Sequence, residues 1–152
     1  MLRLAIAGCG LISQKKHIPA FLKLRNVLEI VAVCDLNESA AKFVSEKFKI
    51  KKYYTSYQDM LLKEKPDIVD ICTPPQTHSN LAIQALQQGS HVILEKPMAS
   101  SVSQCDGMIQ ASVKSDKYIY VVHTQLFNPA FIKARKLLLN GSVGKFLGLQ
   151  IF

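Results

Sequence analysis

The sequence predicts an α/β fold in which helices cover both faces of a mostly parallel, doubly wound sheet. Three observations predict it. Short, nearly continuously apolar runs alternate with helical patterns along the chain, as strands buried on both faces require. A glycine-containing turn follows the first of these runs. The length of 152 residues and the hydrophobic content of 49% suit one domain of ordinary size with a packed core.

The strands are predicted at apolar, β-rich segments. These segments lie at residues 2–7, 28–34, 67–72, 91–94 and 118–122, with a weak short strand near Tyr53. Strands that alternate with helices form βαβ units with right-handed crossovers, and ligands of such sheets bind at the carboxyl ends of the strands.

The helices are predicted between these strands, at residues 37–48, 56–63, 77–88, 101–115 and 129–140. The first opens with an Asn-x-x-Ala start, and the third repeats apolar residues at helical spacing before Gly89 ends it. The last begins at Pro129 and is followed by Gly141, an asymmetry typical of helix ends. Residues 145–152 resemble the opening of a further strand. An apolar edge of that kind is normally covered, so we expect the protein to continue or another chain to cover this end.

Composition and charge argue against a membrane or nucleic-acid-binding protein. No apolar run approaches the ~20 residues of a membrane span, and the run at 4–8 is too short for a signal peptide, so we expect a cytoplasmic protein without membrane contact. The net charge of +8 fits either an anionic partner such as nucleic acid or a lysine-rich solvated surface. Most of the excess is scattered lysine, with a denser stretch at 47–52 and no interleaved aromatic pattern. We therefore favour the solvated surface and expect no nucleic-acid partner.

The four cysteines predict neither a metal site nor a disulfide framework. Cys9, Cys34, Cys72 and Cys105 form no C-x-x-C pair and share no metal-ligand spacing. Three of them lie at or beside the ends of predicted strands, where a small buried thiol is common. We expect a reducing compartment and no bound metal.

The strongest local signal is the glycine turn that directly follows the first strand and opens a helix. In that context a G-x-G-x-x-G sequence predicts binding of a dinucleotide. Gly8 permits a tight turn, and Gly10 lets the backbone approach a pyrophosphate at the helix N-terminus. The third position is Ser13, a small residue that still allows close packing of the helix against the strand. The predicted cofactor contacts here are Gly8, Gly10, Leu11 and Ile12.

Asp35 strengthens this prediction because it stands at the end of the second strand, where an acid binds the adenosine ribose hydroxyls. The alternative is that Asp35 caps the helix that starts beside Asn37, and both roles are compatible. Its charge repels a 2′-phosphate and no arginine follows it, which favours NAD over NADP. The lysines at 47–52 would favour NADP if the fold brought them close.

Polar residues also follow the fourth and fifth strands. Residues 72–78 read Cys-Thr-Pro-Pro-Gln-Thr-His, and residues 95–97 read Glu-Lys-Pro. Both segments are expected to face the cofactor crevice. Lys96 is a basic side chain with an adjacent acid, so it could exchange a proton with a substrate hydroxyl or carbonyl. The alternative is an incidental lysine in a surface loop.

Segments spread over nearly the whole chain carry a family resemblance. They are residues 7–10 and 17–20, residues 67–74 with His78, residues 85–86, Gly89, residues 91–92 and 95–99, His123, and residues 127–129 and 141–144. Together they resemble the glucose–fructose oxidoreductase, inositol dehydrogenase and rhizopine-catabolism family of NAD(P)-dependent oxidoreductases. The Glu-Lys-Pro tripeptide after a His-Val strand is the most specific of these segments.

The resemblance implies a two-domain enzyme, in which a Rossmann domain precedes an α/β domain with a large open sheet. It implies that Lys96 is the catalytic residue near the nicotinamide and the reacting hydroxyl, and that Glu95 contacts the cofactor near the nicotinamide ribose. It also implies that Thr73, Pro74 and His78 line the cofactor crevice. The implied substrates are sugars, cyclitols and related polyols.

Two departures from the family pattern matter. Leu126 stands where the family often has an arginine, so any contact from that arginine is missing. The usual catalytic aspartate and histidine lie in the second domain, beyond Phe152. We therefore expect a Rossmann domain at residues 1–122, followed at 123–152 by a closing helix and the start of a truncated substrate domain.

The histidines outside these motifs have two interpretations each. His123 could approach the nicotinamide from the end of the sixth strand, or it could be a hydrogen-bonded structural residue, and both interpretations stay open. His17 and His91 are expected to be structural, although His17 could face a phosphate near the first helix. The Lys96–Pro97 bond is a candidate for cis geometry.

Two functions remain open at this point. The first is an oxidoreductase that passes a hydride between the nicotinamide of NAD, or of NADP, and a hydroxyl-bearing carbon of a polyol, with Lys96 assisting the proton transfer. The second is a non-catalytic NAD-binding module or sensor. The resemblance places the usual dimer surface on the second-domain sheet, so a homo-oligomer is expected. The chain as given is expected to bind NAD but to turn over little.

Overall fold

The computed structural model describes residues 1–145 and 147–148. The chain forms two compact units, Met1–Val122 and His123–Phe152. The first contains a six-stranded sheet in the order β3-β2-β1-β4-β5-β6, whose neighbouring strands all pair in parallel. The strands are β1 (Leu2–Ala7), β2 (Leu28–Cys34), β3 (Tyr53–Tyr54), β4 (Ile68–Ile71), β5 (His91–Leu94) and β6 (Ile119–Val121). The predicted doubly wound sheet is confirmed.

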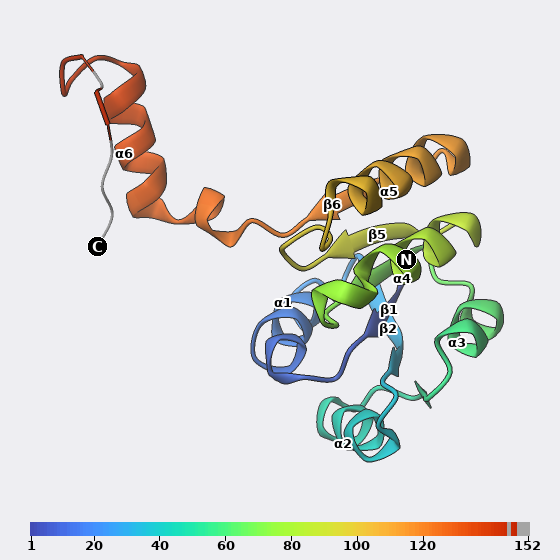
Figure 1. Cartoon of the computed structure of the whole chain (residues 1–152). Helices are drawn as coiled ribbons and strands as arrows, with labels where there is room; N and C mark the ends of the chain where they lie inside the picture. Colours follow the sequence, from blue (N-terminus) through green and yellow to red (C-terminus); the bar gives the residue numbers. More distant parts are fainter. Residues whose placement is uncertain (146, 149–152) are drawn as a thin grey trace. The chain divides into compact units, whose positions relative to one another are not determined.

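Helices cover both faces of this sheet (Figure 1). In the first unit they are η1 (Ser13–His17), α1 (Ile18–Leu22), α2 (Glu38–Phe48), α3 (Tyr57–Glu64), α4 (Pro75–Gln87) and α5 (Val102–Ser115). Because side chains alternate along a strand, Leu4 and Ile6 of β1 pack among residues of α1 and α2 on one face. Ala5 packs among residues of α3, α4 and α5 on the other face. The strand order changes direction between β1 and β4, which is where ligands of such sheets bind.

Most predicted boundaries agree with the structure within two residues. The largest difference is at α4, which starts at Pro75 and not at the predicted residue 77. Proline fits the first turn of a helix, because a backbone N–H there has no partner within the helix. His78 lies in the first turns of this helix, on the buried face that also carries Ala82 and Ala85.

The helix after the glycine turn contains a wider turn than an α-helix. In η1 the N–H of Ile18 donates to the carbonyl of Ser13, five residues earlier, so this turn is π-helical. Pro19 follows directly and has no N–H with which to continue the α-helical ladder through this point. Such π turns within α-helices are rare and occur frequently at functional sites.

The second unit contains η2 (Thr124–Phe127) and α6 (Pro129–Leu139). The side chain of Asn128 caps α6 by accepting the N–H of Ala130 at 2.9 Å. The strand expected at 145–152 falls largely outside the described residues. Within the described part of the chain, no helix has both the length and the apolar character that crossing a bilayer demands.

Candidate functional site

The glycine turn lies where β1 meets the end of β4. Gly8 has a φ of +97°, and a Cβ at this position would lie 2.7 Å from the carbonyl oxygen of Cys72. Only glycine therefore fits. At Gly10 a Cβ would meet nothing within 4 Å, so this side of the backbone is open to a ligand. Ser13 is fully buried beneath the turn, where its hydroxyl donates to the carbonyl of Gly10 at 2.9 Å.

Asp35 anchors this turn from the end of β2. Its Oδ2 accepts the N–H of Cys9 at 2.8 Å, and its Oδ1 accepts the N–H of Asn37 at 2.9 Å. The cap of α2 is Asn37 itself, whose side chain accepts the N–H of Ala40 at 3.2 Å. Asp35 therefore organises both the glycine turn and the approach to α2. Each carboxylate oxygen retains a second lone pair for a further donor such as a hydroxyl.

A cavity of about 690 Å³ opens at the carboxyl ends of β1, β2 and β4. Seven of the sequence-predicted site residues line it: Gly8, Gly10, Leu11, Ile12, Asp35, Thr73 and Pro74. The helix start at Leu11 follows a residue without a side chain, so no side chain at that position caps its first N–H groups. The cavity wall thus combines the start of a helix with a neighbouring carboxylate.

Further residues line the cavity that were not among the named cofactor contacts, although Cys72, Gln76 and Thr77 belong to the segment 72–78 that was expected to face the crevice. The further residues are Ala7, Cys34, Leu36, Tyr57, Cys72 and, from α4, Gln76, Thr77, Asn80 and Leu81. The hydroxyls of Thr73 and Thr77 lie 2.7 Å apart, so the end of β4 and the first turn of α4 form one polar wall. The run of polar residues in the first turns of α4, which includes positions 76, 77 and 80, was the available signal. Finding Tyr57 would have required knowing that α3 packs near this wall.

His78 differs from its expected position in the crevice wall. Its side chain is fully buried, with Nδ1 at 2.9 Å from the carbonyl of Pro97 and Nε2 at 2.8 Å from the carbonyl of Thr73. The ring thus joins the loop after β4 to the loop after β5 from below. His78 shapes the site through these two backbone contacts and does not line the cavity.

Glu95 and Lys96 follow β5 but do not line this cavity either. The predicted cis geometry of the Lys96–Pro97 bond is confirmed. The Lys96 side chain is exposed, while the Glu95 side chain is only 12% exposed. Glu95 Oε2 accepts the backbone N–H of Lys96 at 3.0 Å, and Glu95 Oε1 lies 3.0 Å from His17 Nε2. The carboxylate is therefore already held by two partners.

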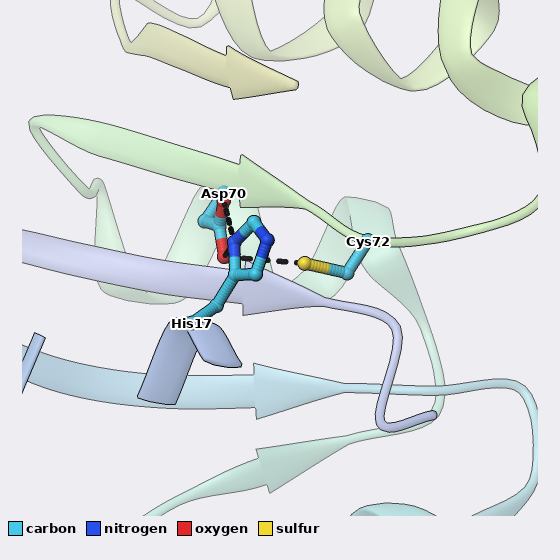
Figure 2. A group of neighbouring side chains, drawn as sticks. All are labelled: His17, Asp70 and Cys72. Carbon is cyan, nitrogen blue, oxygen red and sulfur yellow. Dashed lines mark hydrogen bonds and ion pairs between the residues drawn. The ribbon is translucent and has the colours of Figure 1, made fainter. Parts of the chain in front are cut away.

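A cluster of polar side chains lies beneath this loop. His17, Asp70, Cys72 and Glu95 form it and are called the His17 cluster below. Figure 2 shows the His17 ring between η1 and β4, with Asp70 on one side of it and Cys72 nearby. His17 Nδ1 lies 3.0 Å from both carboxylate oxygens of Asp70, and the Cys72 thiol donates to Asp70 Oδ2 at 3.3 Å. The structural role expected for His17 agrees with these contacts.

The electrostatics of the His17 cluster follow from its burial. Burial lowers the pKa of His17, but the hydrogen bond and charge of Asp70, followed by those of Glu95, raise it to about 9. Burial, followed by the charge and hydrogen bond of Asp70, raises the pKa of the Cys72 thiol well above its usual range. The ring is therefore cationic at neutral pH and the thiol is protonated. A protonated thiol is a poor metal ligand, so we interpret the cluster as a hydrogen-bonded ion pair.

The other two histidines lie elsewhere. His91 stacks on Tyr118, and its Nδ1 accepts the N–H of Tyr118 at 3.1 Å. This agrees with its expected structural role. His123 is exposed and belongs to the second unit, where it precedes η2. Both interpretations of His123 therefore stay open.

Comparison with known proteins gives consistent matches. Residues 2–123 match a family described as an oxidoreductase family with an NAD-binding Rossmann fold. The D-glucoside 3-dehydrogenase of Escherichia coli K12 is 35% identical over 144 residues, which are 95% of this chain and 41% of that protein. The inositol 2-dehydrogenase of Salmonella typhimurium is 25% identical over 146 residues, which are 95% of this chain and 43% of that protein.

Solved structures agree with these sequence matches. The WlbA dehydrogenase from Bordetella pertussis, crystallised with NADH and UDP-GlcNAcA, superposes with a TM-score of 0.89 at 29% identity. The match covers 95% of this chain and 43% of that one. The chain therefore spans less than half the length of the proteins it resembles.

Proposed function

Since the chain belongs to the oxidoreductase family with an NAD-binding Rossmann fold, we propose that it is the cofactor half of a dehydrogenase acting on polyols. The reaction passes a hydride between NAD and a hydroxyl-bearing carbon. One observation carries the proposal: a cavity at the carboxyl ends of β1, β2 and β4 whose wall includes both the bare turn at Gly10 and the carboxylate of Asp35. NAD supplies the hydride chemistry, and the chain supplies binding and orientation.

The cavity wall suits the adenosine and pyrophosphate parts of the cofactor. Gly10, Leu11 and Ile12 line the cavity at the start of the helix, where backbone N–H groups favour negative charge. Asp35 is placed to accept the ribose hydroxyls. Both assignments rest on placement in the cavity wall and on the known preferences of these groups.

The same wall supports NAD over NADP. A 2′-phosphate would meet the Asp35 carboxylate, and the next residue, Leu36, is 93% exposed and offers no positive charge. The lysines that could have reversed this preference do not line the cavity. Lys47 instead donates to the side chain of Gln14, and Lys52 pairs with Glu64.

We assign Lys96 the proton transfer to or from the reacting hydroxyl. Its exposed side chain follows β5, beside the switch point of the sheet, and the resemblance of Glu95-Lys96-Pro97 to the family motif supports the role. The similarity to a D-glucoside 3-dehydrogenase and an inositol 2-dehydrogenase supports a sugar or cyclitol substrate. The family resemblance supports a homo-oligomer, with residues 123–152 opening the substrate domain. The free, mostly buried cysteines fit the cytoplasm.

A glycine substitution tests the cofactor site. Gly10→Ala adds a methyl group where the protein has nothing within 4 Å, so the fold is retained while the approach of the pyrophosphate is obstructed. We expect NADH affinity, measured by fluorescence titration of the chain, to fall by about tenfold or more, which corresponds to ~1.4 kcal/mol. Gly107→Ala in α5, whose Cβ would meet only a side-chain atom at 4.0 Å, is the matched control and should bind as the wild type does. Wild-type chain that fails to bind millimolar NADH would end the proposal.

A further inference from the structure

We propose that His17 is a positioning residue for the loop that carries Lys96, acting through Glu95. The inference rests on the proposed function of Lys96, because the loop matters only if that lysine does. It assigns His17 a role beyond packing: the ring fixes the Glu95 carboxylate, and the carboxylate in turn fixes the backbone N–H of Lys96.

The contacts form one continuous chain across three elements. Asp70 on β4 holds Nδ1 of His17 at 3.0 Å, and Nε2 of the same ring holds Glu95 Oε1 at 3.0 Å. Glu95 Oε2 then accepts the Lys96 N–H at 3.0 Å. Asp70 and Glu95 lie 53 and 78 positions from His17 in the sequence. The helix that begins at the glycine turn is thereby tied to the loop after β5.

Asp70 is the fixed end of this series of hydrogen bonds. It pairs in register with Ile6 of β1 and Ile93 of β5, and its side chain is fully buried. A carboxylate in such surroundings is costly unless it is paired. Its partners among the described residues are the His17 ring and the Cys72 thiol. The buried carboxylate of Asp70 therefore stabilises the protonated form of His17. Because both ring nitrogens of an imidazolium donate, His17 can bond to the carboxylates of Asp70 and Glu95 at the same time.

The backbone of η1 and a neighbouring aromatic ring help to fix the position of the His17 side chain. The π turn ends at His17, where the hydrogen bond from Ile18 to Ser13 widens the helix. The neighbouring ring of Phe21 meets His17 edge-on at 6.3 Å between centroids. Lys15 and Lys16 on the same turn are exposed, so the charged groups that face His17 are Asp70 and Glu95, with the neutral thiol of Cys72 behind Asp70.

Loss of the His17 proton would leave one ring nitrogen unable to donate, so one carboxylate would lose its partner. Glu95, which is the less buried of the two, is the one free to turn away. Lys96 would then lose the acceptor of its N–H. The proposal therefore predicts that the surroundings of the Lys96 backbone N–H change when His17 loses its proton, although the two groups are not in contact.

Nuclear magnetic resonance of the 152-residue chain tests this directly. We expect the His17 ring nitrogens to report a protonated ring that titrates near pH 9. The amide resonance of Lys96 should titrate with the same midpoint. In Asp70→Asn both midpoints should move together to lower pH. A Lys96 amide that shows no titration in step with His17 overturns the proposal.

Two variants keep the test decisive if a single substitution unfolds the chain. The double variant His17→Gln/Asp70→Asn replaces the buried ion pair with two neutral amides that can bond to each other, and it should abolish the titration at Lys96. Glu95→Gln should abolish it too, while His17 itself still titrates. Glu64→Gln, a change far from the loop in sequence, should leave it unchanged. A Lys96 titration that survives in the double variant refutes the coupling.

The outcome is separable from that of the proposed function. If the wild-type chain does not bind NADH, the cofactor assignment falls, but the coupled titration can still be present or absent. If NADH binds and Lys96 ignores His17, the cofactor site stands and the positioning role is wrong.

Discussion

Asp70 and Glu64 are both buried carboxylates, but the cations that neutralise them lie in different surroundings. Asp70 faces His17, whose side chain is 8% exposed. Glu64, at the end of α3, pairs with Arg3 and Lys52, whose side chains are 43% and 56% exposed. The first pair has its cation inside the protein, and the second draws its cations from the surface.

The two clusters consequently respond to opposite ends of the pH scale. Burial alone would raise the pKa of Glu64, but hydrogen bonds from Tyr54 and Lys52 and the charges of Lys52 and Arg3 lower it. The cluster loses its contribution when the Glu64 carboxylate takes up a proton, so it weakens in acid. The His17 cluster depends on a proton that leaves near pH 9, so it weakens in mild alkali. Only this second kind of cluster adjoins the Lys96 loop.

The largest difference should come from removing each buried partner. His17→Leu leaves the Asp70 charge buried without a cation, and we expect it to reduce the free energy of unfolding by about 3–5 kcal/mol. Urea unfolding at pH 7 measures this. His91→Leu, which removes a histidine that stacks at a partly exposed position, is the control and should cost far less. A His17→Leu loss below ~1 kcal/mol would mean that Asp70 is not a buried anion.

The pH dependence of stability should separate the clusters next. The pKa of His17 is 6.5 when unperturbed and about 9 in the folded chain, so its contribution is complete below pH 6.5 and is lost as the pH rises through 9. That contribution is on the order of 3 kcal/mol. We expect wild type and Glu64→Gln to lose stability together over this window in urea unfolding. The double variant His17→Gln/Asp70→Asn should show a flat profile there, and a slope like that of wild type would contradict the assignment.

The smallest effects should come from the Glu64 cluster. Glu64→Gln keeps an oxygen for Tyr54 and returns two solvated cations to water, so we expect a loss of about 1–3 kcal/mol. Lys52→Met removes one exposed partner and should cost ~1 kcal/mol or less. The wild-type contribution of Glu64 is present above its ordinary pKa of 4.5 and is lost as the pH falls through the lower folded value. Thermal unfolding between pH 3 and pH 7 checks this, and equal acid sensitivity of wild type and Glu64→Gln would count against it.

Local patterns carried most of the fold prediction. The bounds of β1, β2 and β5 agree with the predicted segments because each is an apolar run with a clear end. The glycine turn and Asp35 were also found from sequence, since their spacing encodes one local geometry. The start of α4 was misplaced by two residues because the Pro74-Pro75 pair can either end a loop or begin a helix.

The contacts that join distant segments were beyond sequence reasoning. Nothing near His17 indicates that it meets Asp70 on β4 and Glu95 directly after β5, which lie 53 and 78 residues further along the chain. One signal was available: Asp70 interrupts an otherwise apolar strand that is buried on both faces. A charge at such a position requires a partner, although the sequence does not say which. The contacts of Glu64 with Arg3 and Lys52 likewise join separate segments and could not be predicted from the sequence.

The π turn at Ser13–His17 determines how the start of this helix, near Gly10, is rotated relative to its later part, at His17. An α-helix advances by about 100° per residue, and the i to i−5 bond at Ile18 absorbs one residue beyond that repeat. Deleting a single residue here would restore a regular α-helix and rotate its two ends relative to each other by about 100°. The N–H groups near Gly10 and the ring of His17 would no longer both face their partners. Within this short stretch the number of residues therefore matters as much as their identity.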